Sequence, residues 1–219
     1  ADRHPGELSI LATGSLTNLR GAYERDRYFF EKVKEIVLMG GITSPLVFDK
    51  KVMNELNFSC DPPATRTVLT KGRNVSIMTG NNCLKVLFTK QEYRERFSGK
   101  ENRAAAYIME KTDYWFGYND EDYGIPGFYN WDVTAAAYLM HPELFEDDVK
   151  CLRVSEQDLE TGYLGMDGDG IRDGAADGKK GERCTCNLPV IREPEAFKDN
   201  IYETWLSVPG IRTGVCRQN

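Results

Sequence analysis

Three short apolar runs that end in or beside glycine constrain the fold of this chain more than any other feature. The runs are "LSILAT" at 8–13, "EIVLMGG" at 35–41 and "NVSIMTG" at 74–80, and each has the length of a buried strand. The segments between them, 15–34 and 61–71, have the apolar spacing of helices. Strands that alternate with helices through short links predict an α/β fold with a mainly parallel sheet flanked by helices.

The expected helix starts differ in strength. Ser15 is predicted to be the N-cap of the first helix. Asp61 followed by Pro62 is a stronger start for the second helix, because the N–H groups of a first helical turn have no partner within the helix and proline, which has no N–H, therefore loses no hydrogen bond there. Further elements are predicted as helices at 90–99, 102–118, 131–141 and 194–206 and as a strand pair at 150–164 and 185–191. No repeat and no long linker divides residues 1–219, so we expect a single domain.

Composition excludes several classes of protein. The formal net charge is −6, with 28 Lys and Arg against 34 Asp and Glu, which disfavours nucleic acid as a partner. No apolar run approaches the roughly 20 residues that span a bilayer, and no basic amphipathic segment suits a membrane surface. The chain begins with Ala1 and without a signal peptide, which indicates a processed or recombinant product or a fragment; the compartment stays open.

The six cysteines do not form a zinc motif. No C-x-x-C pair occurs, and the chain has only two histidines. Cys184 and Cys186 are close in sequence and are expected either to form a disulfide with Cys151 or Cys216 or to be buried free thiols. With so few histidines, acid–base chemistry falls to carboxylates, with a metal ion.

Residues 54–57, "NELN", place an acid and two amides just before the helix that Asp61 starts. Ligands of open parallel sheets bind beyond the carboxyl ends of the strands, which Thr13, Met39 and Thr79 mark here. We therefore expect the polar segment to lie at that edge. Two interpretations are open: an ordinary capped loop, or a set of hydrogen-bonding groups for a polyhydroxylated ligand.

Three further features have both a structural and a functional interpretation. Asp132 begins an apolar helix, where it is either an N-cap or a functional carboxylate. The aromatic-rich segment 114–132, which includes Trp131, is predicted to be a loop that contributes to the core or stacks on a flat ring. The Asp/Gly-rich segment 165–181 is predicted to be an inserted hairpin loop that either binds structural calcium through Asp167, Asp169, Asp173 and Asp177 or is a flexible acidic hairpin.

Five segments in order resemble the nucleoside hydrolase family (inosine–uridine-preferring type). "LATGSLTNLR" resembles the family's ATGPLTN, "VKEIVLMGG" its VxxIVxMGG and "NELNFSCDPPAT" its AEFNxxxDPEAA. "NWDVTAAAYLMHPELF" resembles HDPxAVAYLxxPELF, and "DLETGYLG" resembles VETxGxLTxG. The resemblance implies an open α/β fold and Ca²⁺-dependent hydrolysis of the N-glycosidic bond of ribonucleosides, commonly by homo-oligomers.

Carried over by position, the resemblance assigns roles to six residues. The Thr13 carbonyl and the Asp132 carboxylate would bind the metal ion, Glu55 and Asn57 would bind ribose hydroxyls, and Met39 would line the pocket. Trp131 stands where the family often has a histidine that protonates the leaving base; an indole is not an acid, so Trp131 would instead stack on the base.

The chain also departs from the family pattern. Leu56 replaces a usual phenylalanine, and Asp49 is the nearest counterpart of a second ribose-binding asparagine. The acidic DTDxGxDD motif, which supplies further metal ligands and the general base, is absent from these 219 residues, so we expect one strand to be missing and this chain alone to be inactive. Three explanations are open: a second chain completes the enzyme, the chain is truncated, or the protein is a catalytically inactive nucleoside- or sugar-binding protein.

Overall fold

The computed structural model describes residues 1–99, 102–166 and 181–208, which form two compact units. The first unit comprises Ala1–Val47, Val52–Lys85 and Asn130–Arg192, and the second comprises Phe48–Lys51, Val86–Tyr129 and Glu193–Asn219. Most of the predicted insertion, residues 167–180, lies outside the described residues. Among the described helices, none is long and apolar enough to cross a membrane.

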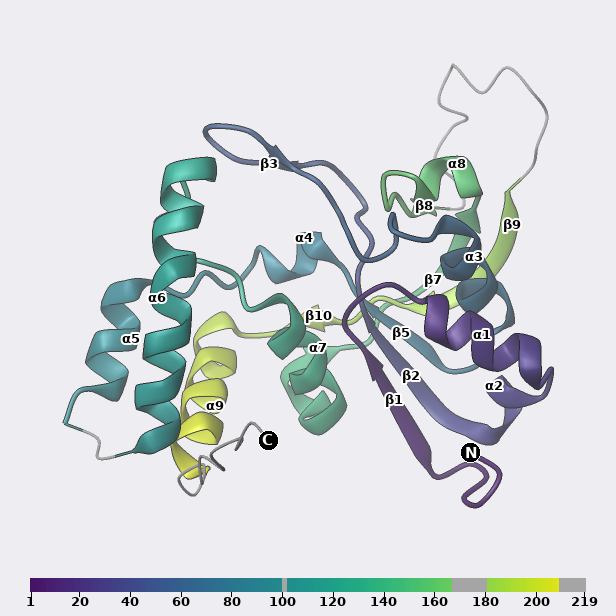
Figure 1. Ribbon diagram of the computed structural model, residues 1–219, viewed down its shortest axis with the longest axis horizontal. Coiled ribbons are helices and arrows are strands. Elements are labelled where there is room, and N and C mark those ends of the chain that lie inside the picture. Colours follow the sequence, from purple (N-terminus) through teal and green to yellow (C-terminus); the bar gives the residue numbers. More distant parts are fainter. Residues whose placement is uncertain (100–101, 167–180, 209–219) are drawn as a thin grey trace, which may run out of the picture. The chain divides into compact units, whose positions relative to one another are not determined.

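A six-stranded sheet with the order β1-β2-β5-β9-β7-β8 organises the first unit (Figure 1). Its strands are β1 (Leu8–Ala12), β2 (Val33–Met39), β5 (Val75–Met78), β7 (Val149–Val154), β8 (Gly165–Met166) and β9 (Glu182–Asn187). β1, β2, β5 and β9 are parallel neighbours, whereas β7 is antiparallel to both β9 and β8. The predicted α/β fold with a mainly parallel sheet is thereby confirmed.

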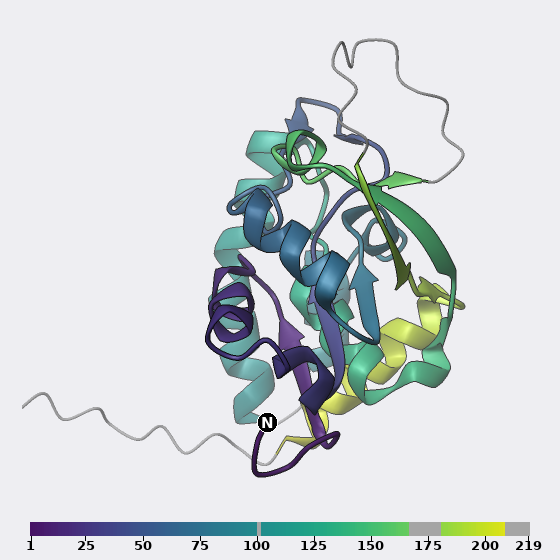
Figure 2. The same cartoon turned by 90° about the vertical axis from the view of Figure 1, so that its right-hand side faces the viewer.

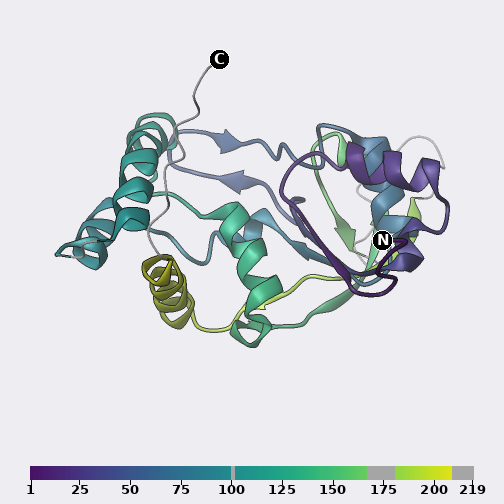
Figure 3. The same ribbon diagram turned by 60° about the horizontal axis from the view of Figure 1, so that its bottom comes forward.

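Helices cover both faces of the sheet. The helices of this unit are α1 (Thr17–Arg25), α2 (Phe29–Lys32), α3 (Pro62–Lys71), α4 (Gly80–Cys83), α7 (Trp131–Met140) and α8 (Glu156–Leu159). The sheet separates α7 from α1 and α3 (Figures 1 and 3), and Figure 2 looks onto the face with α3 and α1 in front of the strands. The core on the α1/α3 face includes Leu16, Phe30, Ile36, Leu38, Phe58 and Val68, all buried.

Short elements complete the unit. They are the hairpin of β3 (Leu46–Val47) and β4 (Val52–Met53), the pair β6 (Phe145–Glu146) and β10 (Val190–Ile191), and a 3₁₀ turn at Pro142–Leu144. The sequence patterns did not predict these two-residue strands, which are too short to show a period.

The second unit contains α5 (Lys90–Phe97), α6 (Arg103–Tyr123) and α9 (Pro194–Ser207). Aromatic rings pack edge to face between them, for example Tyr93 and Tyr202 with centroids 5.7 Å apart. The helix predicted to end at 118 extends further into the aromatic-rich segment than expected, because α6 continues to Tyr123 and ends at Gly124, whose φ of 73° suits glycine.

Other predictions also need correction. Leu16, not Ser15, is the N-cap of α1, because the Ser15 hydroxyl pairs with that of Thr17 at 2.8 Å. The predicted helix 15–34 breaks where Asp26 accepts a hydrogen bond from the Tyr28 N–H, a local bond that competes with the helix. Residues 155–159 are not strand, because Ser155 caps α8 by accepting from the Asp158 N–H.

The disulfide between Cys151 and the Cys184/Cys186 pair does not form. Cys151 lies opposite Thr185 in the β7–β9 ladder, so its side chain is on the other face of the sheet from Cys184 and Cys186. The sulfurs of Cys184 and Cys186 lie 4.0 Å apart as thiols on one face. Cys216 lies outside the described residues.

β1 is the outermost strand of the sheet, and its outer edge pairs with no other strand of the described residues. Leu8 and Leu11 on this strand are 41% and 39% exposed, although strands of parallel sheets are normally covered on both faces. This edge is therefore an apolar, hydrogen-bonding surface within the described part of the chain.

Asp61→Ala should lower the free energy of unfolding by about 1 kcal/mol at neutral pH, the usual effect of losing an N-cap. Asp61 accepts from the Ala64 N–H at 3.0 Å and from the Thr17 hydroxyl at 2.6 Å. The Thr17 bond, the Ala64 bond and the charge of Arg20 lower the pKa of Asp61, so this stabilisation is complete above about pH 4 and disappears as pH falls through the lowered value.

Denaturant unfolding from pH 7 to pH 2 measures the effect, with Asp61→Asn as a control that keeps a capping oxygen but does not titrate. A wild-type minus Asp61→Ala difference that is absent at pH 7, or unchanged down to pH 2, would contradict it.

Candidate functional site

The carboxyl ends of three parallel strands lie side by side in the first unit. β1 ends before Thr13, β2 ends at Met39 and β5 ends before Thr79, and β2 pairs with both of the others. Neighbouring parallel strands end at the same edge of a sheet, so the strand ends singled out from the sequence meet as expected.

The turn after β2 requires glycine at both positions. Gly40 has φ 156° and Gly41 has φ 73°, and the Gly41 conformation is one that other residues rarely adopt. A Cβ at Gly40 would lie 2.6 Å from the Phe58 ring, and one at Gly41 would lie 2.8 Å from Leu164. The buried Phe58 ring thus packs directly on the backbone of this turn.

The Glu55 carboxylate binds the backbone of that same region. It accepts from the N–H groups of Gly41 at 3.2 Å, Phe58 at 2.9 and 3.1 Å, and Ser59 at 2.9 Å. The Phe58 N–H is shared between the two oxygens, so three donors use about three of the roughly four acceptor positions of an ionised carboxylate and leave about one for a ligand. Glu55 therefore organises its own loop, as the ordinary-loop interpretation requires, and keeps capacity for one hydroxyl.

Asn57 is held against the end of β2. Its amide nitrogen donates to the carbonyl of Met39 at 2.9 Å and contacts the Met39 sulfur at 3.2 Å. No donor among the described residues reaches its amide oxygen, which remains an acceptor for a hydroxyl group. Leu56, between Glu55 and Asn57, is 68% exposed.

Trp131 and Asp132 begin α7, which packs against β1, β2 and β5. The Trp131 carbonyl lies 4.0 Å from the sulfur of Cys83, in the helix that follows β5, so the start of α7 lies just beyond the end of β5. Burial and the nearby Asp132 carboxylate raise the pKa of the Cys83 thiol to about 12.

Asp132 is not the N-cap of α7, so the structural interpretation of this residue was wrong. Asn130 occupies the N-cap position and Asp132 lies in the first turn, where a carboxylate interacts favourably with the helix dipole. Its side chain reaches solvent, but the groups around it remove enough water to raise the pKa of the carboxyl.

All six residues assigned by the resemblance belong to the first unit, and the strand ends, the Glu55 loop and the start of α7 bring them to one edge of the sheet. Asp49 lies at the tip of the β3–β4 hairpin and belongs to the second unit. Within residues 1–99, 102–166 and 181–208, no three His, Cys, Asp or Glu side chains are grouped so as to hold a metal ion.

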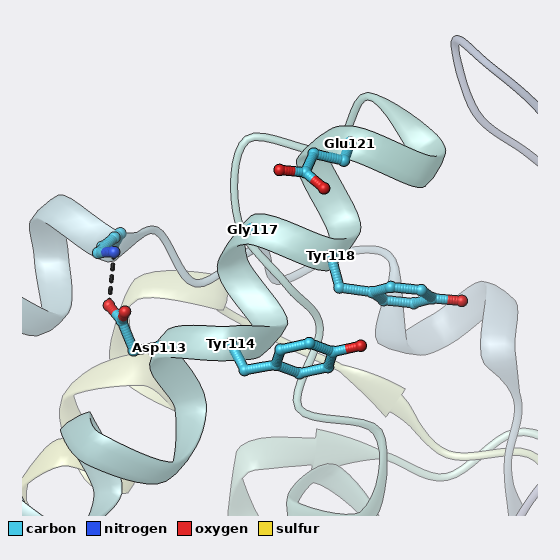
Figure 4. A pocket seen from close by; sticks show the side chains of 6 residues that line it. Asp113, Tyr114, Gly117, Tyr118 and Glu121 are labelled. Atoms are coloured by element: carbon cyan, nitrogen blue, oxygen red, sulfur yellow. Dashed lines mark ion pairs between the residues drawn. The ribbon is translucent and has the colours of Figure 1, made fainter.

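A separate depression of about 330 Å³ lies on α5 and α6 in the second unit. Figure 4 shows Tyr114 and Tyr118 extending in the same direction from α6, with Gly117 between them and Asp113 paired to Lys90 at 2.5 Å. Its lining includes part of the aromatic-rich segment 114–132 but none of the six residues to which the resemblance assigns roles.

The sequence reasoning missed Gly162 as a neighbour of Glu55. The Glu55 side chain fills the space that a Cβ at Gly162 would occupy. The glycine is visible in "DLETGYLG", but its positive φ of 71° and its contact with a residue more than a hundred positions away are not.

The sequence is similar to one known protein family and to several of its members. The family described as "Inosine-uridine preferring nucleoside hydrolase" matches residues 1–198. The rice (Oryza sativa subsp. japonica) "Probable uridine nucleosidase 1" is 33% identical over 169 residues, which are 74% of this chain and 50% of the relative. "Pyrimidine-specific ribonucleoside hydrolase RihA" of Salmonella newport is 30% identical over 158 residues, 72% of this chain and 50% of the relative.

Solved structures show the same fold. A plant nucleoside hydrolase, PpNRh1, has a TM-score of 0.78 at 22% identity and covers 95% of this chain and 64% of its own. A purine-preferring ribonucleoside hydrolase from Gardnerella vaginalis has a TM-score of 0.74 at 20% identity, covering 94% of this chain and 62% of its own. The chain spans about half the length of the curated relatives that it matches. Its profile, relatives and fold place this chain in the inosine-uridine preferring nucleoside hydrolase family.

Proposed function

We propose that the protein to which this chain belongs hydrolyses the N-glycosidic bond of ribonucleosides, releasing a base and ribose. The observation that carries the proposal is the grouping of Glu55, Asn57 and Asp132 at the carboxyl edge of a family-type sheet. Ribonucleosides are polyhydroxylated ligands with a flat ring, which is the chemistry that this edge offers.

The ribose would bind to the loop after β4. The Glu55 carboxylate would accept one hydroxyl through its remaining acceptor position, and the Asn57 amide oxygen would accept another, with Met39 forming the adjacent wall. Breaking the bond builds positive charge on the sugar ring, so fixed acceptors near the ring favour the transition state.

Asp132 and the Thr13 carbonyl would contribute to a Ca²⁺ site. Both offer hard oxygen atoms, the donors that Ca²⁺ prefers, but they are only two of the roughly six to eight that this ion takes. The rest would come from a segment carrying the family's acidic cluster, which would also supply the general base. Bound Ca²⁺ would hold the sugar diol and acidify a water molecule.

Trp131 would stack on the leaving base at the start of α7. Its indole offers a large aromatic face but no acidic proton at neutral pH, so activation of the leaving group must come from another source. Stacking accommodates purine and pyrimidine rings and favours the larger purine face.

The outer edge of β1 would receive a further strand, either from the same polypeptide or from a second chain. The exposed Leu8 and Leu11 and the unused hydrogen-bonding groups of β1 support such an addition. Assembly into homo-oligomers stays a prediction from the family resemblance.

An alternative is a nucleoside- or sugar-binding protein that retains the ribose-binding groups without hydrolysis. One observation favours it: Trp131 stands where the family often has a histidine that protonates the leaving base. It predicts ribonucleoside binding without base release in the full-length protein.

Asp132→Ala in the full-length protein should reduce Ca²⁺-dependent turnover of inosine and uridine by at least about 1000-fold, since loss of an essential charge-stabilising group has effects of this order. Glu195→Ala is the matched control, because Glu195 also lies in the first turn of a helix and is largely exposed, with a relative side-chain accessibility of 77%. Base release is measured by ultraviolet absorbance, and unchanged turnover in Asp132→Ala would contradict the assignment.

Trp131→Ala should raise the KM for ribonucleosides about tenfold, because base stacking contributes on the order of 1–3 kcal/mol, but should leave the affinity for free ribose unchanged. Steady-state kinetics and ribose inhibition separate the two effects. Equal losses for ribonucleoside and ribose would show that Trp131 supports the site without contacting the base.

Hydrogen exchange tests the added strand. The β1 backbone amides within Leu8–Ala12 that point away from β2 should exchange rapidly in the isolated 219-residue chain and be protected in the full-length protein, because pairing with an added strand shields them. Equally fast exchange in both would contradict the pairing.

A further inference from the structure

Gly162 lies in a turn that is fixed to the backbone after β2. The Ile42 N–H donates to the Gly162 carbonyl at 2.8 Å, and the Leu164 N–H donates to the Ile42 carbonyl at 2.8 Å. The Gly162 N–H donates to Leu159 at 3.0 Å, which ties the turn to the end of α8. Hydrogen bonds to Ile42 and to Leu159 therefore fix the position of Gly162.

The α-carbon of Gly162 faces the Glu55 carboxylate directly. A Cβ at this position would lie 2.1 Å from Oε2 of Glu55 and 2.6 Å from both Cδ and Cγ. Such contacts are far shorter than van der Waals separations, so any side chain at residue 162 must displace Glu55. The φ of 71° at Gly162 adds a second requirement for glycine.

Any displacement of the Glu55 carboxylate would break hydrogen bonds. Displacing its carboxylate would break the bonds from Gly41, Phe58 and Ser59, whose N–H groups would then lack their acceptor. Gly41 and Phe58 are themselves buried, so these donors have little access to water. The turn at Gly162 and the three N–H groups thus together restrict the position of the carboxylate.

We propose that Gly162 is a positioning residue for ribose recognition: it leaves the space in which Glu55 keeps the one orientation that presents its remaining acceptor to the sugar. This inference rests on the proposed function. It assigns a role in ribose binding to the segment "DLETGYLG", through Glu55 and without contact with the substrate.

The test compares Gly162→Ala with Gly6→Ala in the full-length protein. Gly6 has φ 75°, and a Cβ there meets nothing within 4 Å, so this control has the same backbone strain without the steric contact. Gly162→Ala should raise the KM for inosine and uridine about 10- to 100-fold, as small displacements of binding groups do, and Gly6→Ala should leave it within about twofold.

The most informative comparison is the effect of Gly162→Ala on KM in a protein that already carries Glu55→Ala. If Gly162 acts through Glu55, then adding Gly162→Ala to Glu55→Ala changes KM by no more than about twofold, since the displaced group is already absent. The same cycle on thermal unfolding gives a readout without substrate: Gly162→Ala should lower Tm less in the Glu55→Ala background than in the wild type. The comparison of Tm values also tests the inference if Gly162→Ala alone is too unstable for kinetic measurements.

Additive effects of the two substitutions on KM and Tm, or a Gly162→Ala variant that behaves like Gly6→Ala, would overturn the inference while the wild-type enzyme remains active. A wild-type protein that neither binds nor cleaves ribonucleosides would instead overturn the proposed function, and with it any role of Gly162 in binding ribose.

Discussion

The Glu55 carboxylate, with its bonds to three backbone N–H groups, is the interaction on which the candidate site depends. It joins the turn after β2 to the loop that precedes α3, and the turn at Gly162 closes against it. Charge-assisted bonds of this kind are roughly twice as strong as neutral ones, and their donors have no alternative acceptor when buried. The same side chain stabilises the loop and, in the proposed function, offers an acceptor to a sugar, so the structural and functional interpretations of "NELN" are compatible.

The environment of Asp132 differs from that of Glu55. Asp132 is exposed to solvent at the start of a helix, and the groups around it disfavour its charged form. A carboxylate in this situation gains more from a cation than one already satisfied by hydrogen bonds, as Glu55 is. This contrast agrees with the proposed division of roles, in which Glu55 binds sugar and Asp132 binds metal.

Local patterns in the sequence predicted much of this structure. The Asp61–Pro62 helix start, the β2 strand and the meeting of three strand ends follow from spacing and from the physics of parallel sheets. The predicted Ser15 cap was wrong, and the length of α6 and the break at Asp26 were not predicted, because each depends on a competing hydrogen bond or on packing between distant segments. The contact between Gly162 and Glu55 depends on packing between distant segments, and one sequence contains no signal for it.

The most direct measurement of the central claim is base release from inosine and uridine by the full-length protein, first with a chelator and then with Ca²⁺ restored. The account predicts stoichiometric release of base and ribose that the chelator abolishes and Ca²⁺ recovers. Tight binding of either ribonucleoside with no release of base in the presence of Ca²⁺ would contradict it and identify a binding protein built on a hydrolase fold.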